Sequence, residues 1–176
     1  MSMHPIVRRA GLVAALTLAA AVPASAQTLP PYTRTADLSG PRFGLTLLSD
    51  GIVDKLTERQ IAIDRPYVSQ FGWQFEKQFF TQDSGVTMVT EWVALLGGLE
   101  QSIGLPSLSW IVGLRTRDGA EFGIGPNITP AGTALVFATG MTFRTGAVNV
   151  PVNVAIVPSK SGTRVSVLTG FSLRRR

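Results

Sequence analysis

The sequence predicts an all-β fold: a single closed antiparallel up-and-down β-barrel of about eight strands. Apolar and polar residues alternate with a period of two in one segment after another, which is the pattern of strands with two unlike faces. Gly, Pro, Asp and Ser separate these segments, as they do in hairpins. Because an open sheet would expose its edges, closure into a barrel is the expected arrangement.

Alternation and turn signals together place the individual strands. In chain order the predicted strands are residues 42–49, 67–80, 86–98, 108–116, 120–125, 133–144, 147–157 and 163–174. The clearest is QFGWQFEKQFF, residues 70–80, in which Phe71, Trp73, Phe75 and Phe79 share one face. Tight hairpins are expected at Asp-Gly, residues 118–119, and at Thr-Gly, residues 145–146. Only residues 50–60 have the character of one or two helical turns.

The first 26 residues have the features of a secretory signal peptide. A positive start containing Arg8 and Arg9 precedes an apolar run, residues 10–22, and Ala-Ser-Ala at 24–26 offers a cleavage site. The run is shorter than the ~20 residues that a membrane-spanning helix needs. We therefore expect a signal peptide at 1–26, an extended Pro-rich segment at 27–41 and a barrel domain at 42–176.

The composition excludes several kinds of chemistry. The chain has no cysteine, and its single histidine, His4, lies in the predicted signal peptide. A mature chain without His or Cys lacks the residues of Ser-His-Asp catalysis, thiol catalysis and the usual zinc sites. No enzyme activity, metal or cofactor is therefore expected.

The charge distribution gives no sign of nucleic-acid binding. Removing Arg8 and Arg9 leaves 14 basic and 11 acidic residues, and the three terminal arginines, residues 174–176, account for the excess. A basic stripe with interleaved aromatic residues is absent from the sequence. The terminal arginines either contact anionic lipid headgroups or form a simple charged tail.

Two kinds of barrel fit the alternation. A lipocalin-like soluble barrel would turn its apolar face inward onto a ligand, whereas a membrane barrel would turn it outward onto lipid. The polar face is rich in glycine and has balanced charges, which suits a narrow lumen better than a surface in water. The predicted polar network of the lumen is Arg42, Glu76, Glu91, Arg115, Glu121, Arg144 and Arg164. The predicted lipid-facing residues are Phe71, Trp73, Phe75, Trp92, Trp110, Phe137, Phe143 and Phe171.

Strand three and the connections between strands supply further expectations. In the third predicted strand, residues 86–98, Val89, Val93 and Leu95 share a face with Glu91, which departs from a purely polar lumen.

The predicted connections alternate between longer ones, at 50–66, 98–107 and 126–132, and short ones. This alternation is typical of small membrane barrels, with short periplasmic turns and longer outer loops.

In these features, residues 42–174 resemble the small eight-stranded outer-membrane β-barrel proteins of Gram-negative bacteria. The resemblance is architectural, and the chain departs from it where Phe171 and Leu173 are followed by three arginines instead of ending on an aromatic residue. It implies insertion in outer-membrane lipid by the barrel-assembly machinery, a filled lumen instead of an open pore, and a structural or loop-mediated binding role. The alternative is a periplasmic or secreted lipocalin-like carrier of an apolar ligand.

Two sets of carboxylates are candidates for chemistry. Asp50, Asp54 and Glu58 share one face of the predicted helical segment, where they would form either a cation site or a solvated, salt-bridged loop. The lumen glutamates, at positions 76, 91 and 121, would act as an acid–base pair or, with arginines on the same face, as structural ion pairs. A membrane-embedded enzyme acting on lipid would need the acid–base arrangement.

Overall fold

A computed structural model describes residues 37–173. The predicted signal peptide, residues 27–36 of the Pro-rich segment and the three terminal arginines lie outside the described residues. Within the described part of the chain, no helix has the length and apolar character needed to cross a membrane.

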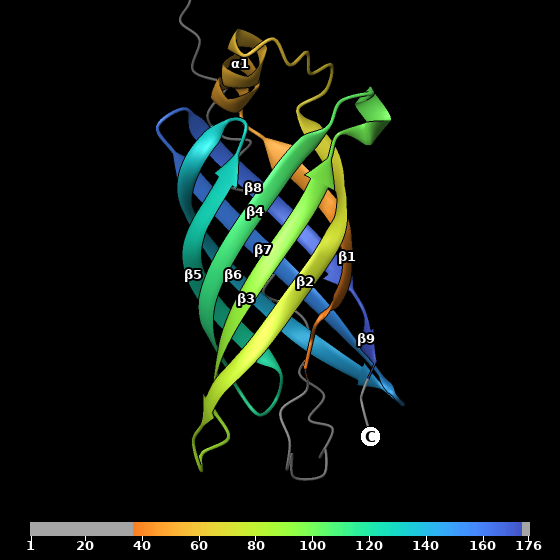
Figure 1. Cartoon of the computed structure of the whole chain (residues 1–176), viewed down its shortest axis with the longest axis vertical. Helices are drawn as coiled ribbons and strands as arrows, with labels where there is room; N and C mark the ends of the chain where they lie inside the picture. The colour runs from red at the N-terminus through yellow and green to blue at the C-terminus, as the bar shows by residue number, and fades with distance from the viewer. Residues whose placement is uncertain (1–36, 174–176) are drawn as a thin grey trace, which may run out of the picture. The chain divides into compact units, whose positions relative to one another are not determined.

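The described chain forms a closed antiparallel barrel, as predicted (Figure 1). Its long strands are β1 (Gly40–Leu48), β2 (Tyr67–Thr81), β3 (Thr87–Gly97), β4 (Leu105–Arg115), β5 (Ala120–Thr129), β6 (Gly132–Thr145), β7 (Val148–Ser159) and β8 (Gly162–Gly170). Each strand pairs with the next, β1 also pairs with β8, and β6 pairs with β7, so the sheet has no free edge along the barrel. A short β9 (Ser172–Leu173) follows Phe171 and pairs with the start of β7.

Strand β5 is longer than predicted. It was expected to end at Gly125, but it continues through Pro126 to Thr129. The β4–β5 register includes Ser109 paired with Asn127 but no pair for Pro126, which has no N–H to donate. The prediction that a longer loop spans 126–132 is therefore wrong, because β5 and β6 are joined by residues 130–131 alone.

The two ends of the barrel differ. One end, called here the loop end, carries the connections 49–66 and 98–104 together with two-residue links after β5 and β7. The opposite end, called the turn end, carries the connections 82–86, 116–119 and 146–147. Long connections are thus confined to one end, although only two of the three predicted long ones exist.

The connection after β1 contains the predicted helical turns, as α1 (Asp50–Glu58). Its inner face packs Ile52 and Leu56 against Leu48, Val68 and Leu105. The start of α1 is fixed to β8, because Ser49 N–H donates to the Thr163 carbonyl at 3.1 Å and Thr163 N–H donates to Ser49 Oγ at 3.0 Å. The helix therefore covers the lumen at the loop end (Figure 1).

The residues just before and within the start of β1 close the turn end. The Pro-rich lead-in was expected to reach residue 41, but β1 begins at Gly40. Leu38 is only 1% exposed, and its carbonyl accepts a hydrogen bond from Arg42 Nη2 at 2.6 Å. Ser39 Oγ accepts the backbone N–H of Glu76 at 2.9 Å. Leu38 and Ser39 are therefore part of the packed barrel.

Two glycines on the lumen face permit close contact between strands. A Cβ on Gly72 would lie 2.0 Å from the Ala94 carbonyl oxygen, and one on Gly44 would lie 2.0 Å from the Val167 carbonyl oxygen. No side chain fits at such distances without a backbone shift. Close contact between strands therefore explains why glycine occupies these two positions on the lumen face.

Candidate functional site: the layered lumen and the apolar outer face

The seven charged residues predicted for the lumen do not form one network. Arg42, Glu91, Arg115 and Arg164 are 2–6% exposed, and the side chains of Glu76 and Glu121 are 0% and 8% exposed. The seventh, Arg144, is half-buried near the turn end and donates from Nη2 to the Arg117 carbonyl at 3.2 Å. Of the six buried residues, four form one layer, Arg164 is the centre of a second, and Arg42 contacts Gln74 and Leu38.

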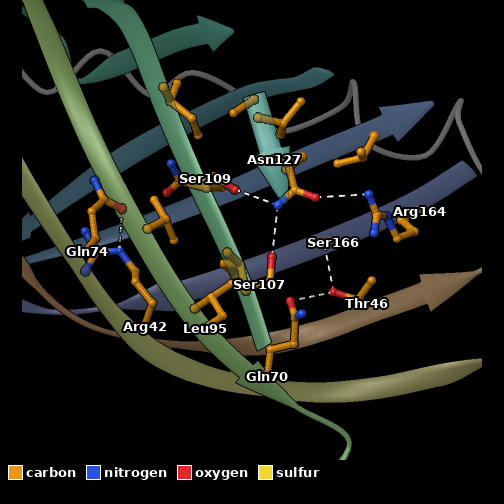
Figure 2. Close-up of a pocket in the computed structure, with 18 of the residues that line it drawn as sticks. Arg42, Thr46, Gln70, Gln74, Leu95, Ser107, Ser109, Asn127, Arg164 and Ser166 are labelled. Atoms are coloured by element: carbon orange, nitrogen blue, oxygen red, sulfur yellow. Dashed lines mark hydrogen bonds between the residues drawn. The ribbon is translucent and has the colours of Figure 1, made fainter. Parts of the chain in front are cut away.

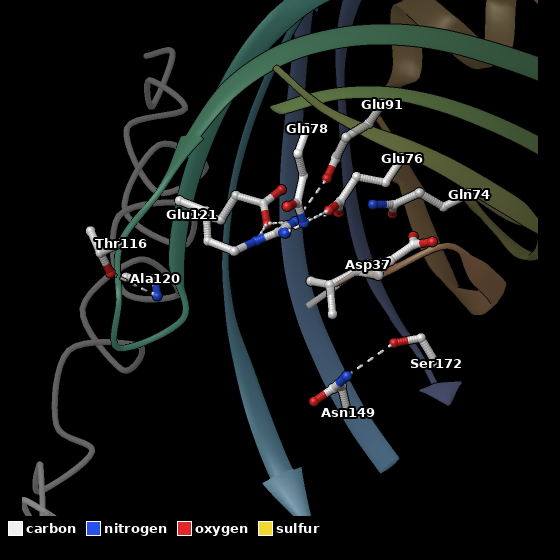
Figure 3. Close-up of polar contacts among 12 residues, drawn as sticks. Asp37, Gln74, Glu76, Gln78, Glu91, Thr116, Ala120, Glu121, Asn149 and Ser172 are labelled. Atoms are coloured by element: carbon white, nitrogen blue, oxygen red, sulfur yellow. Dashed lines mark hydrogen bonds and ion pairs between the residues drawn. The ribbon is translucent and has the colours of Figure 1, made fainter. Parts of the chain in front are cut away.

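The first layer is a cluster of three carboxylates around Arg115 (Figure 3). Arg115 Nε donates to Glu121 Oε2 at 2.8 Å and Nη1 donates to Glu76 Oε1 at 2.7 Å. Nη2 contacts Glu76 Oε2, lies 2.7 Å from Glu121 Oε2 and lies 3.4 Å from Glu91 Oε1. A two-pronged guanidinium–carboxylate contact of this kind is strong and directional.

Strand register explains why these four residues meet. Glu76 pairs with Glu91 across β2 and β3, and Arg115 pairs with Glu121 across the β4–β5 hairpin. All four have lumen parity, so their side chains converge. Because every carboxylate of the cluster contacts the same guanidinium, the geometry favours structural ion pairs over an acid–base pair.

An apolar layer follows toward the loop end. It consists of Val93, Ile111, Val136 and Val157, each at most 6% exposed. Val93 belongs to the face of β3 that seemed anomalous in the sequence, where Val89 and Glu91 are also buried. The lumen face of β3 is thus mixed because it contributes to both a charged layer and an apolar layer.

The second polar layer is centred on Arg164 (Figure 2). Arg164 Nη2 donates to Asn127 Oδ1 at 3.0 Å, and Nη1 donates to Thr129 Oγ1. Asn127 Nδ2 in turn donates to Ser107 Oγ and Ser109 Oγ, both at 2.9 Å. Asn127 is not among the residues predicted for the lumen. The signal for it was present, because the alternation of β5 continues past Pro126 and gives Asn127 lumen parity.

Further side chains complete this polar layer across β1, β2 and β8. Thr46 Oγ1 donates to Gln70 Oε1 at 2.7 Å and lies 2.7 Å from Ser166 Oγ. Nearer the turn end, Arg42 Nε donates to Gln74 Oε1 at 3.0 Å. The hydrogen-bond partners of Arg42 and Arg164 are therefore neutral oxygens, in contrast to those of Arg115.

Two small cavities remain between the layers. The larger, of about 70 Å³, is lined by residues from both polar layers and the apolar layer, including Arg42, Glu91, Asn153 and Arg164. The smaller, of about 40 Å³, lies beneath α1 and also touches Arg164. Ligand pockets for drug-sized molecules are typically ~300–1,000 Å³. Neither cavity has room for the apolar ligand of a lipocalin-like carrier.

The apolar face of the barrel points outward. The eight residues predicted to face lipid are 40–56% exposed. Among the outward strand positions that the structure describes, Lys77 is the single charged residue. Trp92 and Trp110 stack on this surface with ring centroids 5.8 Å apart. The surface is therefore apolar around the barrel.

Several polar atoms on this outer face are hydrogen-bonded within the protein. Thr90, Thr139 and Thr169 have outward parity, and each hydroxyl donates to a backbone carbonyl, at 3.3, 3.0 and 3.0 Å respectively. The Trp110 indole N–H donates to Thr90 Oγ1 at 2.8 Å. Such internal pairing is what polar atoms require where no water is available.

The carboxylates predicted as a candidate binding loop lie on α1. Asp50, Asp54 and Glu58 are all exposed, and Glu58 pairs with Lys55 at 3.0 Å. No group of His, Cys, Asp or Glu suited to hold a metal ion occurs in residues 37–173. This arrangement matches the solvated, salt-bridged alternative.

Comparisons with known proteins add little to this description. No protein-family model and no curated protein matches the chain. One solved structure with partial similarity is Ail, the attachment invasion locus protein of Yersinia pestis, crystallised with the heparin analogue sucrose octasulfate. It is 11% identical, with 80% of this chain and 100% of Ail covered, at a TM-score of 0.30. The fold assignment therefore rests on the strand pairing described above.

Proposed function

We propose that this chain is an outer-membrane β-barrel protein without enzymatic activity, which acts structurally or binds partners through its loop end. One observation carries the proposal: the outer face is apolar around the barrel, and its few central hydroxyl groups donate to backbone carbonyls. Within residues 37–173, 26 large apolar side chains are at least 37% exposed. A soluble monomer rarely exposes a continuous apolar surface of more than a few hundred Å².

The arrangement of the two faces supports lipid outside over a ligand inside. A lipocalin-like carrier would need aromatic side chains in the lumen and polar ones on the surface. Here Phe75 is 56% exposed, whereas the neighbouring Gln74 is 4% exposed. Strands β1–β8 have 9–15 residues, and about 9–11 residues suffice for a tilted strand to cross a bilayer.

A filled lumen, not an open pore, is the second part of the proposal. Charged, apolar and polar layers succeed one another between Leu38 at the turn end and α1 at the loop end. Each layer is closed by side chains that contact one another, and the cavities between them are about 70 and 40 Å³. Passage of a solute would require several of these contacts to break.

The loop end is the proposed binding surface. Helix α1 holds Asp50, Asp54 and Glu58 on its exposed side, while Ile52 and Leu56 fix it to the barrel. A helix anchored in this way presents its side chains with little loss of conformational entropy on binding. The proposed partners are outer-membrane lipid around the strands and the assembly machinery during insertion, with recognition at α1.

Membrane placement can be tested first by fractionation and gel mobility. We expect the protein in the outer-membrane fraction, with a mobility that changes when the sample is boiled, since a folded membrane barrel resists detergent. Recovery in the periplasm or medium, with one mobility under both conditions, would contradict the proposal.

Single cysteines can then test the two faces, because the chain has no cysteine of its own. We expect Phe75→Cys to react with a bilayer-embedded thiol reagent and Gln74→Cys to be protected. Thr57→Cys on α1 should react with a membrane-impermeant reagent on intact cells, and Asp118→Cys at the turn end should not. The reverse pattern for positions 74 and 75 would rule out a lipid-facing aromatic surface.

A further inference from the structure

We propose that the lumen cavity is a binding site for a small inorganic anion of chloride size, held by Arg164. The inference concerns the interior of the barrel and does not depend on the proposed role of its loops. It rests on the isolation of one buried guanidinium from every carboxylate of the lumen and on the cavity that this residue lines.

Arg164 is a buried cation with neutral partners. It is 6% exposed, and its terminal nitrogens donate to Asn127 Oδ1 and Thr129 Oγ1. All three lumen carboxylates are instead gathered on Arg115. Among the described residues no carboxylate forms an ion pair with Arg164. A buried charge without a counter-charge is costly, so an additional ligand that supplies negative charge would be strongly favoured.

One donor of Arg164 is unused. Its Nε is buried and has no hydrogen-bond partner among the described residues. Arg164 also lines the cavity of about 70 Å³. A cavity needs at least ~10–15 Å³ to hold one water molecule, so this cavity has room for a small ion with some water.

The cavity lining defines the class of ligand. Arg42 faces the same space, whereas Glu91, the one carboxylate of the lining, contacts Arg115. The Ser109 hydroxyl, which accepts from Asn127 Nδ2, is also part of the lining and keeps its own proton free to donate. Positive charge in a small space favours a compact anion over a cation, and the size of the space excludes an organic molecule.

Asn127 offers a sharp test, because it already contacts Arg164. The substitution Asn127→Asp is nearly isosteric and would place a carboxylate where the amide oxygen lies, 3.0 Å from Arg164 Nη2. The serines at 107 and 109, which accept from the Asn127 amide, carry hydroxyls that can rotate to donate to a carboxylate instead. The variant thus carries its own counter-charge.

The experiment is urea unfolding of the folded barrel in detergent micelles over a range of chloride concentrations, with gluconate as the large replacement anion at constant ionic strength. If chloride binds the folded state alone, each tenfold rise above its dissociation constant multiplies the folding equilibrium constant of the wild type by about ten. We expect Asn127→Asp to unfold at higher urea than the wild type in gluconate and to have lost the chloride response.

Arg144→Met is the matched control. The Arg144 side chain is also on the lumen face, but it lies toward the turn end of the barrel, whereas Arg164 lies toward the loop end. It should keep the chloride response of the wild type. Line broadening of the ³⁵Cl NMR signal by the wild type, absent with Asn127→Asp, provides a second measurement that needs no unfolding. The proposal is overturned if the wild type shows neither a chloride response nor broadening, or if Asn127→Asp retains both.

Discussion

The Trp110 indole and the Thr90 hydroxyl form a hydrogen bond of 2.8 Å on the outer face of the barrel, between two adjacent strands. The hydroxyl in turn donates to the Ile111 carbonyl at 3.3 Å. Every polar atom of this pair is therefore satisfied without water. The pair provides a direct measure of whether the outer face lies in lipid.

Replacing Thr90 with Val should destabilise the barrel in lipid vesicles by about 1–3 kcal/mol, because the Trp110 N–H would lose its acceptor in a medium without water. Urea unfolding in vesicles would measure the loss. Trp110→Phe removes the donor, so Thr90→Val should cost much less in that background. Equal costs in the two backgrounds would show that the hydrogen bond does not matter.

Charge on the outer face should be equally informative. Ile124 lies near the middle of β5, is 40% exposed and is bordered by Phe137 on β6. Ile124→Arg is expected to lower the free energy of unfolding in vesicles by about 2–4 kcal/mol, the cost of a cation near the bilayer midplane. Ile124→Leu is the control and should be close to neutral. A loss below about 0.5 kcal/mol for Ile124→Arg would be typical of a surface in water.

Arg115 should be the most sensitive residue of the lumen. Arg115→Met leaves three buried carboxylates without their shared cation, and we expect a loss of about 3–5 kcal/mol in the free energy of unfolding. Changing the three glutamates to Gln in the same protein should recover part of that loss, because the uncompensated charge is then gone. No recovery in urea unfolding of the combined variant would argue against a charge effect.

Gly72 is expected to tolerate no side chain. Gly72→Ala places a Cβ 2.0 Å from the Ala94 carbonyl oxygen and should destabilise the barrel by about 1–3 kcal/mol, the usual range for overpacking. At Gly104 a Cβ would make an ordinary 3.8 Å contact with Leu96 Cδ1, so Gly104→Ala is the matched control. Similar unfolding midpoints for the two variants would contradict the steric explanation.

The connection between β3 and β4 should respond to acid. Burial opposes ionisation of Glu100, but hydrogen bonds from Ser69, including its N–H at 2.7 Å, outweigh this and lower the pKa of Glu100. A lowered folded-state pKa contributes stability above the unfolded value of ~4.3, and this contribution is lost as pH falls through the folded value. At pH 7 the wild type should therefore unfold at a higher urea concentration than Glu100→Gln. In acid the two proteins should unfold at the same urea concentration. A difference that is independent of pH would contradict this assignment.

The division into an apolar and a polar face could be predicted because it depends on parity alone. Phe75 and Gln74 are neighbours in the chain, and the alternation around them already places them on opposite faces. The orientation of the faces followed from the glycines and balanced charges of the polar one. The lumen position of Asn127 is not predicted, because a proline normally ends a strand, whereas β5 continues past Pro126 although Gly125 and Pro126 have no partners on β4.

The layers of the lumen could not be predicted, because they depend on how strands are staggered around the barrel. Arg115 and Glu121 flank a recognisable hairpin, so their contact could be predicted from the sequence. Glu76 reaches the same guanidinium from a strand 39 positions away, and Arg164 reaches Asn127 from 37 positions away. Both contacts, and the isolation of Arg164 from carboxylates, are set by the shear of the closed sheet.

The pairing of β1 with β8 should also affect the course of folding. Arg42 lies opposite Gly170, so the seam joins residues that are far apart in the sequence, and the entropy of loop closure makes it the pairing that we expect to form last. Until then the sheet has two unpaired edges, each able to template another chain. Closure is thus the late, long-range step that should limit the folding rate, and refolding yield should fall as protein concentration rises.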